Sequence, residues 1–127
     1  MHWRRKTSLF VAAGSTKAGD ISGGQMIHVV AIITAKPGKR GQILSAALDN
    51  LAAVRAERGC IEYGPVADAE GFDFQTKLGP DTFVVIEKWE DADALRDHAA
   101  APHMAAYGAK VKELIAGRAV HVLESVE

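Results

Sequence analysis

Glu87 is the residue whose surroundings in this sequence point most directly to chemistry. It belongs to a predicted strand, Thr82–Glu90, in which Phe83, Val85 and Trp89 fall on the same side as Glu87. A carboxylate among apolar neighbours loses solvation, so its pKa should rise unless it finds a partner. Glu87 is therefore a candidate general base or ligand-orienting group. A structural ion pair with a helix histidine or arginine is the alternative.

Two histidines follow this strand in the chain. His98 and His103 are separated by Pro102, and they lack the i, i+4 spacing that places two metal ligands on one helix face. We therefore predict no metal site. We expect His98 to reach over the strand end toward Glu87. His103 is a further candidate for the site, with a capping or surface role as the alternative.

Aromatic residues supply the rest of the candidate site. Trp89 and Phe83 could form a wall for a planar substrate, or they could be interface core. Tyr63 and Tyr107 could offer hydroxyl hydrogen bonds to a phenolic ligand. The single cysteine, Cys60, has only Arg58 as a basic neighbour in sequence, so we expect a buried and unreactive thiol.

Composition excludes several classes of protein. A chain of 127 residues with 48% apolar residues is the size of one domain with a real core. Fifteen basic and sixteen acidic side chains give a net charge of -1, which provides no general attraction to nucleic acid or to an anionic membrane. No apolar run approaches the roughly 18 residues of a membrane span. One cysteine excludes an internal disulfide and is compatible with the cytoplasm, where we place the protein.

The first twenty-five residues differ from the rest. They are basic, with Arg4 and Arg5 near the start, and rich in small polar residues and glycine. The apolar run 9–13 is shorter than the roughly seven residues of an export signal. We predict a flexible N-terminal arm at 1–25, or a true start at Met26, followed by one domain at 26–127.

Hydrophobic periodicity outlines the elements of that domain. Apolar and β-branched runs predict strands, and apolar residues spaced by three and four predict helices that end at glycine or proline. The predicted strands are Ile27–Ala35, Cys60–Val66, Thr82–Glu90 and Arg118–Val126. The predicted helices are Arg40–Arg58, a stretch opened by Asp91 as N-cap, and His103–Ala116 after a break at Pro102. Residues 72–77 are either a further strand or an irregular segment.

The order β-α-β-β-α-β predicts an α+β fold. Two helical segments then cover one face of a four-stranded antiparallel sheet, in a ferredoxin-like arrangement. One helix layer cannot cover both faces, and the side with Phe83, Val85, Glu87 and Trp89 is too apolar to be left in water. We expect that face to meet the sheet of a second subunit, giving a homodimer with a pocket beneath each sheet.

Several short strings of this sequence resemble one known family. They are AKPGK at 35–39, ERGCIEY at 57–63, FVVIEKWE at 83–90, and His98 followed by Pro102-His103-Met104. In this order they resemble the antibiotic biosynthesis monooxygenase family, and the resemblance spans 26–126. It implies a dimeric α+β barrel.

The resemblance also implies an activity. Relatives include quinol and hydroquinone monooxygenases that use no cofactor, in which the deprotonated substrate reduces molecular oxygen directly. Carried over, Glu87 and His98 are the catalytic pair, and substrate binding falls to Trp89, Phe83, Tyr63 and His103. The partners would be a small aromatic or phenolic substrate and oxygen.

The same superfamily offers two other interpretations. A haem-degrading branch uses an asparagine on the first strand, where this sequence has Ala31, so a haem role is disfavoured. A non-catalytic dimer that binds a small ligand, for example in stress response, remains the alternative. It would gain if structural arginines such as Arg96 or Arg118 fully paired Glu87 and His98.

Overall fold

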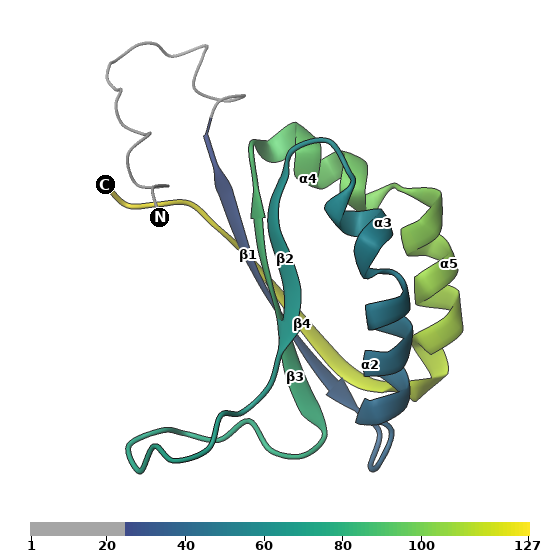
Figure 1. The fold of residues 1–127 in the computed structure, drawn as a ribbon, viewed down its shortest axis with the longest axis vertical. Coiled ribbons are helices and arrows are strands. Elements are labelled where there is room, and N and C mark those ends of the chain that lie inside the picture. The colour runs from purple at the N-terminus through teal and green to yellow at the C-terminus, as the bar shows by residue number, and fades with distance from the viewer. Residues whose placement is uncertain (1–24) are drawn as a thin grey trace.

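The computed structural model describes residues 25–127, so the predicted arm at 1–25 lies outside the described residues except for its last position. Four strands form one antiparallel sheet in the order β2-β3-β1-β4, as the ferredoxin-like prediction requires (Figure 1). Their bounds are β1 Ile27–Ala35, β2 Cys60–Val66, β3 Thr82–Trp89 and β4 Ile115–Leu123. The predicted fold class is confirmed.

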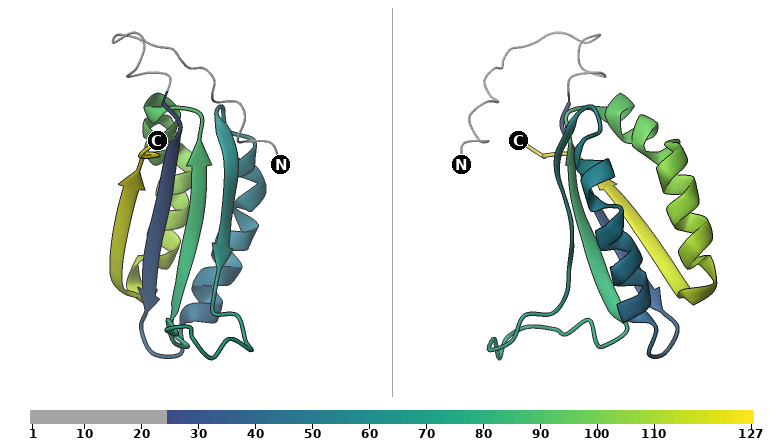
Figure 2. Two further views of the ribbon diagram at one scale, coloured as in Figure 1. Left: turned by 90° about the vertical axis from the view of Figure 1, so that its left-hand side faces the viewer. Right: turned by 45° about the vertical axis from the view of Figure 1, so that its right-hand side comes forward.

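The helices all lie on one side of the sheet (Figure 2). They are α2 Arg40–Asp49, α3 Leu51–Arg55, α4 Ala92–Ala99 and α5 Pro102–Val111, followed by the short 3-10 turn η1 Lys112–Leu114. The predicted break at Pro102 is present, because proline is tolerated in the first turn of a helix but not within it.

The single helix predicted over 40–58 is two helices that meet at Asn50. Asparagine favours local hydrogen bonds over a continuous helix. Here its side-chain amide donates to the sulfur of Met104, 3.4 Å away on α5. Asn50, at the junction of α2 and α3, is therefore joined to α5.

The last strand begins earlier than predicted. It starts at Ile115, which pairs with Ala35 across a register shift in β1, so helix α5 ends at Val111 rather than near Ala116. Pairing with the central strand β1 outweighs the helical periodicity of this segment. Residues 72–77 contain no strand and belong to an irregular loop between β2 and β3.

The two faces of the sheet are the reverse of the prediction. Phe83 and Trp89 are fully buried, and Val85 and Glu87 are nearly so, beneath the helices rather than toward a second subunit. The helix layer covers this face because the large side chains of the face pack against helix residues such as Ile43 and Val54 in two core clusters. No helix within the described residues covers the opposite face, which is the open face of the sheet (Figure 2).

The open face carries the alternate residues of each strand. Register places Val30, Ile32, Val84 and Ile86 next to one another in its centre, and the helices lie on the far side of the sheet (Figure 2). Among the described residues, no helix combines the length and the apolar character needed to cross a membrane.

Candidate functional site

Glu87 lies in the middle of the helix-covered face. It pairs with Val29 on β1 and with Tyr63 on β2, so apolar or aromatic side chains flank it on both neighbouring strands. The indole Nε1 of Trp89 donates a hydrogen bond to its Oε1 at 2.9 Å. Its other oxygen accepts no hydrogen bond from a described residue. Trp89 thus holds one oxygen of the carboxylate, and the other oxygen can still accept a hydrogen bond or a proton.

The environment raises the pKa of Glu87 above its ordinary value. Loss of solvation is the largest cause, and the negative charge of Glu57 adds to it. The hydrogen bond from Trp89 and the charges of His98 and Arg118 act in the opposite direction without cancelling it. The pKa of Glu87 is therefore raised, as the strand pattern predicted, and within residues 25–127 Glu87 forms no structural ion pair of the kind considered as the alternative.

His98 reaches this group through Trp89 rather than directly. Its ring lies against the indole, with centroids 4.7 Å apart and planes at 33°. It also meets the ring of Tyr63 edge-on at 5.4 Å. The helix that carries it is fixed at its start by Asp91, whose side chain accepts a hydrogen bond from the Ala94 amide at 2.8 Å. Trp89, His98, Tyr63 and Glu87 thus form one continuous cluster.

The direct partner of His98 is Glu57, which the sequence analysis did not single out. Glu57 belongs to the segment between α3 and β2. Nδ1 of His98 lies 3.1 Å from each of its carboxylate oxygens. Nε2 of His103 lies 2.6 Å from Oε2 of the same carboxylate, although the ring is not aligned for a hydrogen bond. His103 thus lies beside the site, against the same carboxylate as His98.

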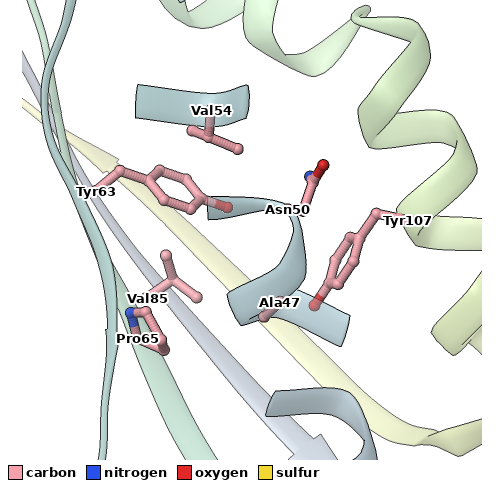
Figure 3. A pocket seen from close by; sticks show the side chains of 7 residues that line it. All are labelled: Ala47, Asn50, Val54, Tyr63, Pro65, Val85 and Tyr107. Atoms are coloured by element: carbon pink, nitrogen blue, oxygen red, sulfur yellow. The ribbon is translucent and has the colours of Figure 1, made fainter. Parts of the chain in front are cut away.

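A small hollow adjoins the cluster. Its lining comes from both layers: Ala47, Asn50, Val54, Tyr63, Pro65, Val85 and Tyr107. Tyr63 extends from β2 and Tyr107 from α5 toward the space near Asn50 (Figure 3). The depression measures about 290 Å³ with its open mouth included, and its enclosed part has room for about one water molecule.

The polar groups of the hollow are two phenols and an amide. Neither the Tyr63 nor the Tyr107 hydroxyl bonds to another described residue. Burial raises the pKa of both, and for Tyr63 the charge of Glu87 adds to the effect, so both phenols keep their protons and can donate hydrogen bonds. Tyr63 is also the cross-strand partner of Glu87, so this one residue adjoins both the hollow and Glu87.

The two other aromatic residues predicted for the site do not line the hollow. Phe83 is fully buried in the larger core cluster and does not line the hollow. Trp89 is fully buried and reaches the site only through Glu87, His98 and Tyr63. Arg96 pairs with Asp93 on the surface at 3.0 Å, so it does not neutralise the site. Within residues 25–127, no group of three or more His, Cys, Asp or Glu side chains is arranged to hold a metal ion.

The chain is similar to known proteins in sequence and in structure. The family model described as antibiotic biosynthesis monooxygenase matches residues 26–110. The chain is 36% identical over 104 residues to the protein named "Probable quinol monooxygenase YgiN" of Escherichia coli (strain K12), a match that covers 78% of this chain and 97% of that one. It is 37% identical over 91 residues to YcnE of Bacillus subtilis (strain 168), with 71% and 86% covered.

Solved structures give the same picture of the fold. Rv0793 of Mycobacterium tuberculosis superposes with a TM-score of 0.66 at 27% identity, covering 80% of this chain and 96% of that one. SO0527 of Shewanella oneidensis superposes with a TM-score of 0.69 at 25% identity, covering 80% and 92%.

Proposed function

The chain belongs to the antibiotic biosynthesis monooxygenase family, and on that premise we propose that it is a cofactor-independent monooxygenase of a quinol, hydroquinone or related phenolic molecule. The observation that carries the proposal is the Glu87 carboxylate. It is desolvated, has a raised pKa, is held by Trp89 through one oxygen, and lies one cross-strand neighbour away from a hollow lined by two phenols.

The chemistry requires little of the protein. A hydroquinone that loses a phenolic proton becomes electron-rich enough to give an electron pair to molecular oxygen. A ring carbon then bonds to one oxygen atom, and the product is a peroxide on the ring. Loss of water from that peroxide leaves a carbonyl, so hydroquinone and oxygen yield a hydroxyquinone and water. The substrate supplies every electron. The protein must accept a proton, orient the ring and exclude bulk water.

We assign these tasks to the described residues as follows. Glu87 accepts the phenolic proton. A raised pKa favours this role, because the pKa of the base is then closer to the operating pH. Tyr63 and Tyr107 donate hydrogen bonds to substrate oxygens. His98 is the second acid–base group, held against Trp89.

The hollow must widen to admit a ring. Sites for small molecules usually enclose about 300–1,000 Å³, far more than the enclosed part of this one. Tyr63 is the side chain whose movement would join the hollow to Glu87, because it contacts the hollow, Trp89 and His98 at once. We therefore expect the Tyr63 side chain to move when substrate binds.

We also propose a homodimer. Because the helices cover the face first predicted to meet a second subunit, we place the contact between subunits on the open face of the sheet. Val30, Ile32 and Ile86 lie half-buried there, and Val66 and Leu123 are about half exposed. Such an apolar face is typical of a surface that packs on a partner. We also retain the cytoplasm as the predicted location.

The test is oxygen uptake by the purified full chain, stripped of metal, over a panel of hydroquinones, with substrate autoxidation as the blank. We expect uptake above the blank, and Glu87→Gln should lower kcat by about 10²- to 10⁴-fold, as loss of an acid–base group does. His98→Ala should also lower it. Glu90→Gln is the matched control, because it removes a carboxylate from a side chain that is 61% exposed at the end of β3.

Each outcome bears on the proposal. Uptake that Glu87→Gln leaves unchanged would keep an oxygenase but remove Glu87 as its base. Uptake equal to the blank over the whole panel, together with saturable binding of the same hydroquinones, would contradict the monooxygenase and support the ligand-binding alternative.

A further inference from the structure

Glu57 holds two histidines from two different helices. His98 comes from α4 and His103 from α5, and both ring nitrogens meet the same carboxylate, at 3.1 Å and 2.6 Å. The Glu57 side chain is 15% exposed and that of His98 only 6%. No lysine or arginine pairs with Glu57 among the described residues. A carboxylate so enclosed needs a donor to offset its lost solvation, and the His98 imidazole is in position to supply one, with the His103 ring beside it.

The contact with His98 fixes where a proton must lie. A carboxylate oxygen and an unprotonated imidazole nitrogen are both acceptors, so 3.1 Å between them requires a hydrogen in between. Nδ1 is the ordinary carrier of that hydrogen. In a neutral ring the lone pair is then on Nε2, which bonds to no described residue.

We propose that Glu57 is a positioning residue that holds His98 in the Nδ1–H tautomer and so leaves Nε2 as the basic nitrogen of the site. The inference rests on the proposed function for its catalytic consequence but not for its structural content. The ring cannot turn freely to present Nδ1 instead, because it lies against Trp89 at 4.7 Å and against Tyr63 at 5.4 Å. Glu57 thus sets the protonation state of Nε2 of His98, although it contacts only Nδ1.

His103 completes the arrangement from the other side. Its Nε2 lies against Oε2 of Glu57, and its Nδ1 has no partner among the described residues. It joins α5 to the same carboxylate that α4 contacts through His98. We therefore expect His103 to restrain Glu57 and to have a smaller effect on His98 than Glu57 itself has.

The first test is nitrogen NMR of the histidine rings in the full chain, at alkaline pH where imidazole is neutral. A protonated and an unprotonated ring nitrogen have well-separated shifts, and His98→Gln identifies the His98 signals. We expect wild type to show Nδ1–H and bare Nε2. Glu57→Leu should lose this preference, whereas Glu57→Gln, whose amide oxygen still accepts a hydrogen bond, should keep it. Glu90→Gln should change nothing.

Wild-type His98 protonated at Nε2 would overturn the proposal, and so would an unchanged tautomer in Glu57→Leu. The wild-type spectrum requires no variant, so the proposal stays falsifiable if Glu57→Leu does not fold.

The second test is kinetic and uses the hydroquinone that gives uptake above the blank. Glu57→Leu should lower kcat about a hundredfold in the wild-type background, the lower end of what an acid–base group contributes, with a much smaller change in KM. In a His98→Ala background the same substitution should cost almost nothing. An equal loss in both backgrounds would contradict a role through His98. A correct tautomer without any turnover would refute the proposed function and leave the positioning role in place.

Discussion

At the scale of single residues, the site depends on the unfavourable burial of Glu87. Its carboxylate accepts one hydrogen bond, from Trp89, and lies among Val29, Val85 and Tyr63. Burial disfavours the charged form, so folding and ionisation of this residue oppose each other. That opposition gives a measurable signature in stability, independent of any assay for activity.

We predict that Glu87 makes the protein less stable as pH rises. Its pKa is raised in the folded state, so the folded chain binds a proton that the unfolded chain has released, starting near the ordinary glutamate value of about 4.3. The contribution of Glu87 to stability should be full below that value. It should fall as pH rises toward the folded pKa and stay low above it.

Urea unfolding of wild type and Glu87→Gln across this range is the measurement. The glutamine keeps an acceptor for Trp89 but cannot ionise, so the difference in free energy of unfolding should move in favour of the variant as pH rises. Glu90→Gln is the control, because Glu90 is exposed. A difference that does not change with pH would contradict the raised pKa.

Sequence reasoning reached Glu87 but missed Glu57, for a physical reason. Glu87 stands on a strand, where alternation assigns every side chain to one face. Glu57 was predicted to continue the helix Arg40–Arg58, but it lies in the irregular segment after α3, so the helical period did not give the direction of its side chain. Its partner His98 is 41 residues further along the chain. Only the tertiary fold brings them together. The same absence of long-range information led to the expectation of a direct contact between His98 and Glu87.

At the scale of elements, the turn at Gly59 controls how the helix layer meets the sheet. Gly59 has a φ of +82°, and a Cβ built there would lie 2.5 Å from the Cβ of Ala94 on α4. Both the backbone conformation and the close approach require glycine. The turn precedes β2 directly and follows Glu57, so its geometry also places the carboxylate that holds His98.

We predict that Gly59→Ala destabilises the protein by at least about 2 kcal/mol, combining left-handed strain with overpacking. Gly38→Ala is the matched control. Gly38 has a similar φ of +77°, but nothing lies within 4 Å of the built Cβ, so it should cost only the conformational share of about 1 kcal/mol. Urea unfolding of both variants provides the comparison. Equal losses at the two positions would show that the approach to Ala94 has no energetic consequence.

The elements themselves were predictable to different degrees. β1 and β3 were predicted to within one residue, because a run of β-branched residues bounded by turn signals leaves little ambiguity. The start of β4 was not, since Ile115 fits a helical period as well as a strand. Pairing with Ala35, a contact between distant parts of the chain, decides between the two.

At the scale of the whole molecule, alternation along β3 identified two faces but not which of them the helices cover. Both contain apolar residues, and a single strand does not say which face is more apolar over the whole sheet. The other strands decide it. Ile27, Val29 and Ile33 of β1 all fall with Trp89 and Phe83, and this larger apolar set is the one beneath the helices. The partner surface therefore had to be reassigned to the opposite face.

We predict that wild type is a dimer and that Ile86→Glu shifts it to monomer. Ile86 lies at the centre of the open face, opposite Val30 on β1 and Gly64 on β2. A twofold interface repeats each substitution, so one change places two carboxylates in an apolar contact. Because each buried charge costs several kcal/mol, the dissociation constant should rise by at least about a hundredfold.

Light scattering coupled to size-exclusion chromatography, over a dilution series, measures the shift. Leu48→Glu is the control, because Leu48 is an apolar residue that is 55% exposed on α2, on the helix side of the sheet. It should leave the assembly unchanged. If the open face is the interface, only Ile86→Glu dissociates the dimer. If Leu48→Glu does so instead, subunits associate through the helix layer, because a charge disrupts a contact only where the contact buries it.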